Sequence, residues 1–410
     1  MKIIAHIGTP KTGTTSIQQV LNANRDHLHS FGYHYLASMG VSNHVAFPRC
    51  FYSKFRPTDE YCRIRRITTP AEFEEHRAAK LRELEDELAS LPAGTHTVVT
   101  SCEHFYSRLN TAEEIAALAG FLDRHFSHVE IVVYLRNQPE LLTSLYSTVL
   151  KADGEISGLH EFTGKVCRES NPYFNFHLGL GRWRDQFGDD ALSARLFARD
   201  EFIDGDLLSD FFGRIDPVLL PGLLRPGSNH NESMTHLGQV IARSVNAVEP
   251  RYIEGAGSNK ENRRWISRIA EAFRRTGQQL PEDVYQRIVD EFRASNENLR
   301  KELFPGRDTL FPGRKQADPN EGRMLTSEQE MVLSSLIGRS RGGRRKSHPK
   351  GAVRVLRDAA AALEGTDLKQ AYQLMKLASA LKPEGDFIKR KLLAYEKKLG
   401  ADASPSSGSD

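Results

Sequence analysis

The chain has 410 residues and a formal net charge of +3, and hydrophobic and charged residues make up 39% and 27% of it. These values are typical of a globular protein with room for two or three domains of about 150 residues. The small net charge gives no reason to expect nucleic-acid binding. No apolar run approaches the ~18 residues of a membrane-spanning helix. The four cysteines form no C-x-x-C pair, which argues against a zinc site and a disulfide framework; they are Cys50, Cys62, Cys102 and Cys167.

The first predicted element is a buried strand over residues 2–8, and a helix over 14–29 follows it at near-3.6 apolar spacing. The strand begins directly after Met1, so we expect no signal peptide or membrane anchor before it and a cytoplasmic location.

A loop rich in glycine, threonine and lysine joins this strand to the helix. Gly8 and Gly13 are separated by four residues, which is the spacing of a phosphate-binding P-loop. This order of elements places unpaired backbone N–H groups where an anion would bind. Thr14 occupies the position after Gly13 where nucleotide-hydrolysing loops have lysine, and the lysine of this loop is Lys11. The displaced lysine argues against ordinary nucleoside triphosphate hydrolysis.

Strand and helix patterns alternate from residue 30 to residue 135. Thr111, followed three residues later by Glu114, predicts a capping box at a helix start. The alternation predicts an α/β fold with a parallel β-sheet flanked by helices on both faces. The predicted strands cover 33–36, 97–102 and 129–135, an amphipathic helix covers 71–91, and the stretch 38–70 is irregular and rich in aromatic residues and arginine.

Further patterns continue beyond residue 135 to about Pro312. Pro139 suits the first turn of a helix. The later predicted elements are a helix over 181–187, a strand over 192–197, a helix from 207, and helices over 232–248 and 259–301, the last broken near Gly277.

The chain changes character after Pro312, so we expect a C-terminal extension to a main domain of residues 1–312. Residues 313–350 contain a basic block and predict a flexible linker. Residues 351–400 regain helical periodicity and resemble one tetratricopeptide-like helical hairpin, too little for a repeat array. Residues 401–410 predict a disordered tail.

Two motifs resemble those of sulfotransferases that use 3′-phosphoadenosine 5′-phosphosulfate (PAPS). In the second, Tyr134 to Pro139 followed by Ser144 is similar to the 3′-phosphate motif, in which arginine ends a strand and serine follows eight residues later. The resemblance implies a P-loop NTPase-like sulfotransferase fold and sulfuryl transfer to an acceptor hydroxyl without a metal. The first motif, similar to the 5′-phosphosulfate loop, is Pro10, Lys11, Thr12, Gly13, Thr14 and Thr15.

The resemblance also implies a role for each motif. The first loop binds the 5′ end of PAPS through its N–H groups and hydroxyls, and Lys11 neutralises charge on the bridging oxygen. Arg136 and Ser144 bind the 3′-phosphate, for which a planar guanidinium is suited. Alone, Arg136 would be taken for a surface or capping arginine and Ser144 for an ordinary helix residue.

The reaction needs a base for the acceptor proton, and two residues are candidates. Glu103 ends the strand over 97–102 in a segment that resembles a strand-end Ser-x-Glu of related enzymes; the alternative is a structural hydrogen-bond acceptor. His44 offers a neutral imidazole near pH 7, and its alternative is a packed or surface histidine. His104 would point to the opposite face of a strand-like segment.

The resemblance alone implies a glycan hydroxyl as acceptor, with an amine less favoured. The chain lacks the Arg-Lys-Gly motif of small-molecule sulfotransferases. Arg225 is therefore only a weak candidate for a basic loop that closes over the nucleotide, and phenols and steroids are disfavoured as acceptors. The alternatives are a P-loop nucleotide kinase, which needs magnesium, and a non-catalytic nucleotide-binding scaffold whose protein partner binds the C-terminal helices. The arginines that suit either an acidic sugar or a solvated surface are Arg49, Arg56, Arg63, Arg65 and Arg66.

Overall fold

The computed structural model divides the chain into two compact units. The first comprises Met1–Leu141, Val166–Asn229 and Gln286–Pro312, and the second comprises Leu142–Lys165, His230–Tyr285 and Gly313–Asp410. This division differs from the expected main domain of residues 1–312, which stays a prediction. The residues that the structure describes are 1–226, 233–253, 257–275, 280–313, 351–365, 367–382 and 385–401.

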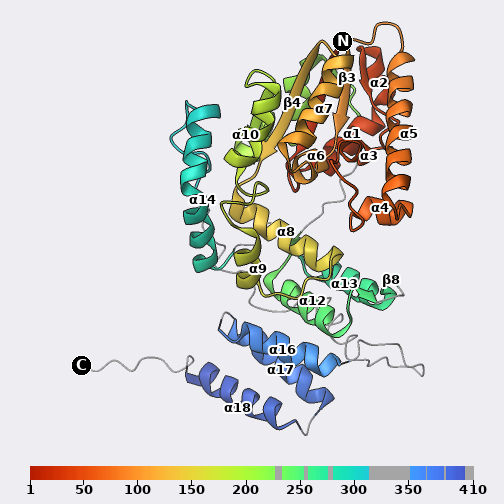
Figure 1. The fold of residues 1–410 in the computed structure, drawn as a ribbon. Coiled ribbons are helices and arrows are strands. Elements are labelled where there is room, and N and C mark those ends of the chain that lie inside the picture. Colours follow the sequence, from red (N-terminus) through yellow and green to blue (C-terminus); the bar gives the residue numbers. More distant parts are fainter. Residues whose placement is uncertain are drawn as a thin grey trace. The chain divides into compact units, whose positions relative to one another are not determined.

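The first unit is built on a β-sheet, of which β3 and β4 are labelled in Figure 1. The sheet has five strands in the order β2-β3-β1-β4-β5. Every neighbouring pair of strands is parallel, which confirms the predicted α/β fold. The central strands are continuous apolar runs because helices cover both faces of the sheet. The strands are β1 (Lys2–Gly8), β2 (Tyr33–Tyr35), β3 (Thr97–Ser101), β4 (His128–Leu135) and β5 (Leu192–Leu196).

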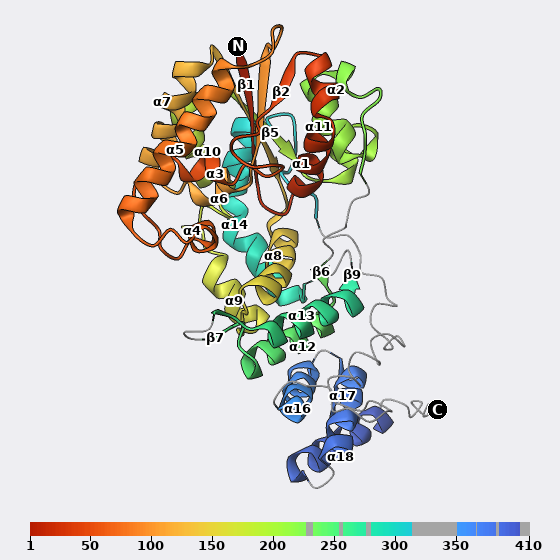
Figure 2. The same ribbon diagram turned by 90° about the vertical axis from the view of Figure 1, so that its right-hand side faces the viewer.

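Helices cover both faces of this sheet, as predicted. The helices α1 (Thr14–Ala23), α2 (Arg25–Ser30) and α11 (Leu207–Ile215) pack on one face, whereas α7 (Ala112–His125) and α10 (Phe176–Phe187) lie beside the other (Figure 2). The first face is closed by a buried cluster that includes Ile4, Ile17, Leu21, Val99, Val132, Phe211 and Phe212.

The helix predicted over 14–29 is two helices, α1 and α2, with Asn24 between them. The Asn24 side chain donates to the Val20 carbonyl at 2.7 Å, a local bond of the kind that competes with helix continuation.

The other elements of the first unit are α3 (Ala46–Arg49), α4 (Glu60–Arg65), α5 (Pro70–Ala89), α6 (His104–Arg108) and the 3-10 turns Arg199–Glu201, Ile203–Gly205 and Pro217–Leu219.

Half of the capping box predicted at Thr111 is present. The Thr111 side chain accepts the N–H of Glu114. The Glu114 carboxylate accepts instead from the N–H groups of Asn110 and Ser53 and from Arg56. Glu114 therefore ties the irregular segment before α5 to the start of α7.

The second unit is helical, with two pairs of short antiparallel strands. Three helices lie over residues 351–401, not the expected hairpin of two; Pro383 in the sequence falls between the last two. The predicted linker, apart from Gly313, and the predicted tail from 402 onward lie outside the described residues. The helices are α9 (Leu159–Val166), α12 (His236–Val248), α13 (Lys260–Ala272), α16 (Ala352–Leu363), α17 (Leu368–Leu381) and α18 (Asp386–Ala401), and the strands are β6 (Ser233–Met234), β7 (Tyr252–Ile253), β8 (Gly257–Ser258) and β9 (Arg274–Arg275).

In the described part of the chain, three helices contain residues of both units; one of them is α9, whose last residue, Val166, belongs to the first unit. The helix α8 (Gln138–Ala152) begins in the first unit, whereas α14 (Glu282–Leu303) begins in the second and continues in the first. The pattern predicted as one broken helix over 259–301 forms the two helices α13 and α14; Gly277, where the break was predicted, lies outside the described residues. No helix in the described part of the chain has the length and apolarity needed to cross a membrane.

Candidate active site

The candidate loop lies at a point where the chain connections of the sheet diverge. From β1 the chain runs to β2 on one side, and from β4, the neighbour of β1, it runs to β5 on the other. Ligands of open α/β sheets bind beyond the carboxyl ends of the strands at such points. The loop after β1 therefore occupies the place in the sheet where a ligand is expected.

The loop is anchored to the end of β4. The N–H and the Oγ1 of Thr9 both donate to the Tyr134 carbonyl at 3.0 Å. The Thr12 hydroxyl is buried and donates to the Thr9 carbonyl. Thr12 therefore stabilises the loop from within.

The first helix begins directly after this loop. Gly13 is its N-cap, with φ 73, and provides no side-chain cap. A β-carbon on Gly13 would lie too close to the end of the Leu207 side chain, which would have to move, and the positive φ itself favours glycine. The first N–H groups of the helix, on Thr14 and Thr15, have no carbonyl within the helix to bond. Such a helix end favours an anion.

Arg136 lies against the loop. Its Nη1 donates to the Lys11 carbonyl at 3.0 Å, and its Nε lies 3.2 Å from the Glu140 carboxylate. The guanidinium carbon is 5.5 Å from the centre of the Phe197 ring. The structure thus brings together the first predicted motif and the arginine of the second.

Ser144, the other residue predicted to bind the 3′-phosphate, lies on α8 in the part assigned to the second unit. Its carbonyl accepts from the Thr148 hydroxyl at 3.0 Å. A role for Ser144 in binding the donor therefore stays a prediction.

Glu103 lies on the other side of β1, just after β3. It is the N-cap residue of α6. A β-carbon on Gly8 would be 3.1 Å from the Cα of Glu103, so the start of the loop and this residue approach closely. The Glu103 carboxylate accepts hydrogen bonds from Gln18 at 3.0 Å and from Asn43 at 3.2 and 3.3 Å.

Sequence reasoning missed Gln18 and Asn43. Two features of the sequence could have pointed to these residues. Gln18 follows Thr14 by four residues and so lies on the same face of a helix, and Asn43 directly precedes the candidate His44.

His44 is fully buried. Its Nδ1 lies 2.8 Å from Thr100 Oγ1 and accepts the N–H of Ser101 at 3.3 Å, and the Tyr35 ring lies 4.4 Å away, centre to centre. Burial, and then the charge of Arg25, lowers the pKa of His44 to about 3. An imidazole so enclosed is a weak proton acceptor.

His104 belongs to a different cluster. Its Nδ1 accepts from Arg49 Nη1 at 3.0 Å, and burial, followed by the charge of Arg49, lowers its pKa to about 4. Arg49 also forms a buried ion pair with Asp59 at 2.8 Å. Arg49 is therefore enclosed by the protein.

The other candidate arginines differ in their surroundings. Arg56 pairs with Glu114 and stacks on Tyr52, and Arg225 pairs with Asp206 at 2.8 Å. The exposed ones are Arg63, Arg65, Arg66 and Arg225.

Among the described residues, no group of three histidine, cysteine or acidic side chains is arranged to hold a metal. The four cysteines are all buried and unpaired.

The chain was compared with known families, curated proteins and solved structures. No family model matches it. An uncharacterized protein of Archaeoglobus fulgidus is 26% identical over 211 residues, which cover 50% of this chain and 54% of that protein; the chain thus spans about half the length of this relative. A solved structure of a sulfotransferase from Alicyclobacillus acidocaldarius aligns with 73% of this chain and 94% of its own, at 16% identity and a TM-score of 0.37. At these levels neither likeness assigns a function.

Proposed function

We propose that residues 1–312 form a sulfotransferase that moves a sulfuryl group from PAPS to an acceptor hydroxyl. The observation that carries the proposal is the 3.0 Å contact between Arg136 and the loop at Lys11, with Glu103 beside the start of the same loop. A helix N-terminus, a lysine and an arginine suit a donor with two anionic ends. A carboxylate at the adjoining strand end suits a base.

Each group has a defined part in the proposed reaction. Glu103 takes the proton of the acceptor hydroxyl, whose oxygen forms a bond to sulfur as the bond from sulfur to the bridging oxygen of PAPS breaks. Lys11 and the N–H groups of Thr14 and Thr15 stabilise the charge on the departing phosphate. Arg136, with Ser144, binds the 3′-phosphate. The products are a sulfate ester and adenosine 3′,5′-bisphosphate.

The acceptor class is proposed from the motif resemblance. A glycan hydroxyl is the first choice, and the exposed Arg63, Arg65 and Arg66 of the segment before α5 suit an acidic sugar. Incubating the protein with labelled PAPS and a glycan library tests this choice. Transfer to neutral and acidic glycans alike would remove the arginines from the proposal.

Calorimetry with adenosine 3′,5′-bisphosphate, with and without magnesium, tests the donor site. We expect binding that needs no magnesium and is weakened in Arg136→Ala. Binding of ATP that requires magnesium would support the alternative of a nucleotide kinase. Tight nucleotide binding without turnover on any acceptor would support the scaffold, with the C-terminal helices as the docking part.

The base is tested by Glu103→Gln, which keeps the shape of the side chain and removes its basicity. We expect kcat to fall about 100-fold or more while nucleotide affinity stays unchanged. A variant that keeps full kcat would reject Glu103. His44→Ala would then be the next variant to assay.

A further inference from the structure

Two side-chain amides converge on the carboxylate of Glu103. Gln18 Nε2 donates to Oε2 at 3.0 Å, and Asn43 Nδ2 lies 3.2 Å from Oε2 and 3.3 Å from Oε1. Gln18 comes from α1, and Asn43 comes from the segment between β2 and α3. A carboxylate held from two independent elements has a fixed orientation.

We propose that Gln18 and Asn43 are positioning residues that orient Glu103 toward the acceptor hydroxyl. The inference rests on the proposed function, because it assigns these amides to the base of that reaction. Neither amide touches the reacting atoms, and both act through Glu103.

Gln18 connects the base to the helix that faces the donor. It is buried, with 3% of its surface exposed, so its side chain has little freedom. It follows Thr14 by four residues and therefore lies one turn along the same face of α1. The helix whose N-terminus would bind the 5′ end of the donor thus also holds the base.

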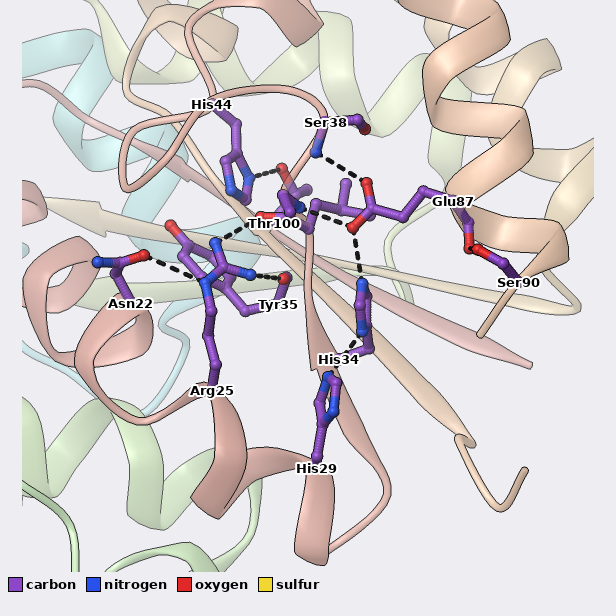
Figure 3. A network of polar contacts seen from close by, with 12 residues as sticks. Asn22, Arg25, His29, His34, Tyr35, Ser38, His44, Glu87, Ser90 and Thr100 are labelled. Carbon is purple, nitrogen blue, oxygen red and sulfur yellow. Dashed lines mark hydrogen bonds and ion pairs between the residues drawn. The ribbon is translucent and has the colours of Figure 1, made fainter. Parts of the chain in front are cut away.

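Asn43 comes from a segment that is held along its length. Arg25 donates to the carbonyls of Tyr35, Leu36 and Val41, and the Tyr35 hydroxyl donates to the Ser42 carbonyl. Figure 3 shows Arg25 beside Tyr35, below His44. This segment is preorganised before any substrate binds.

Glu87 of α5 fixes the start of the same segment. Its carboxylate accepts the N–H groups of Ala37 at 2.7 Å and Ser38 at 2.9 Å and pairs with His34 at 2.7 Å (Figure 3).

The buried His44 anchors the residue next to Asn43. The imidazole of His44 contacts Thr100 (Figure 3), and the backbone N–H of His44 donates to the Ser101 carbonyl at 3.2 Å. Both partners belong to β3, the strand that leads to Glu103. His44 thus fixes Asn43 to the strand that carries the base, which gives it a structural role in the same site.

The amides also distinguish the two carboxylate oxygens. Among the described residues, Oε2 accepts from both amides, whereas Oε1 accepts only the longer Asn43 contact. The Asn43 Oδ1 is buried and has no hydrogen-bond partner in the same part of the chain, so the amide is turned to present its N–H to Glu103. Oε1 keeps more lone-pair capacity and is the oxygen that takes the proton.

Steady-state kinetics of the full chain test this proposal, with Gln18→Leu and Asn43→Ala as the variants. We expect kcat to fall about 10- to 100-fold in each, with the KM for PAPS and the affinity for adenosine 3′,5′-bisphosphate unchanged. The matched controls are the neighbouring Gln19→Leu and Ser42→Ala, which should keep wild-type kcat. Unchanged thermal unfolding of the variants shows that they are folded.

A double-mutant cycle separates positioning from general structural damage. Because the amides act through Glu103, adding either substitution to Glu103→Gln should lower kcat no further. Additive losses, or single variants with wild-type kcat, would overturn the proposal while the proposed function stands. A wild-type protein that binds the nucleotide but transfers no sulfuryl group would reject the proposed function and this inference with it.

Discussion

Gly8 lies so close to Glu103 that a β-carbon on residue 8 would be 3.1 Å from the Glu103 Cα. Its φ of 109° is also in the region that disfavours other residues. We predict that Gly8→Ala lowers the free energy of unfolding by about 1–3 kcal/mol and reduces kcat, because the loop and the base must move apart. Urea unfolding and steady-state kinetics measure the two effects.

Gly94→Ala is the matched control for that prediction. Gly94 has a similar φ of 89°, but nothing lies within 4 Å of the added carbon. Its substitution should show the conformational strain alone and leave kcat unchanged. Equal losses of stability and activity in both variants would show that the approach to Glu103 is unimportant.

Arg136 makes a prediction that depends on the ligand. Charge-assisted hydrogen bonds contribute about 1.5–3 kcal/mol, so Arg136→Ala should weaken adenosine 3′,5′-bisphosphate binding about 10- to 100-fold. The same substitution should reduce the affinity for adenosine 5′-phosphate, which lacks the 3′-phosphate, much less. Calorimetry with both nucleotides checks the difference, and equal losses would assign Arg136 to the loop alone.

Glu140 should act in the opposite direction. Its carboxylate lies 3.2 Å from Arg136 but is 60% exposed, so its effect on a bound phosphate is screened. We expect Glu140→Gln to strengthen binding of adenosine 3′,5′-bisphosphate by a small factor at low salt. Weaker binding in this variant would contradict a phosphate site at Arg136.

The two buried histidines predict how stability depends on pH. Burial lowers the pKa of His6 and of His44 to about 3, from 6.5 in the unfolded chain. Between these values the unfolded chain binds protons that the folded chain does not. The free energy of unfolding is therefore highest above pH 6.5 and falls toward pH 3, by up to about 1.4 kcal/mol per pH unit for each histidine.

Urea unfolding between pH 7 and pH 5, above the range where carboxylates of the unfolded chain titrate, measures this slope. His44→Gln should make it shallower. His128→Gln, at an exposed position, should leave it unchanged. The same slope in all three proteins would show that His44 is protonated without unfolding.

The ion pair of Arg49 and Asp59 should be important for stability. Both side chains are almost fully buried, with 4% and 3% of their surfaces exposed. Asp59→Ala would leave the arginine buried without its charge partner and should cost about 3–5 kcal/mol. The pair of Arg77 and Glu74, whose side chains are 32% and 52% exposed, provides the comparison, because Glu74→Ala should cost at most about 1 kcal/mol.

The elements of the sheet were predictable because their signals are local. The apolar runs of β1, β3 and β4 and the punctuation by Gly13 and Pro139 are readable without any tertiary contact. The contact of Arg136 with the loop was predictable for a different reason: parallel strands place their carboxyl ends at one edge of a sheet.

The contacts of Glu103 were not predictable from such signals. Gln18 and Asn43 lie 85 and 60 residues from Glu103 in the sequence, and no periodicity encodes which side chains meet across that separation. The burial of His44 also depends on tertiary packing, since the aromatic-rich stretch around it is compatible with a surface loop. The break at Asn24 was missed because apolar spacing continues through it to Leu28.

The groups of the candidate site are fastened to three adjoining strands: Thr9 bonds to the end of β4, Glu103 follows β3, and the loop itself continues β1. Such interior strands open to solvent only when the surrounding unit unfolds. Loss of ligand affinity and loss of the sheet in denaturant should therefore coincide in one cooperative transition.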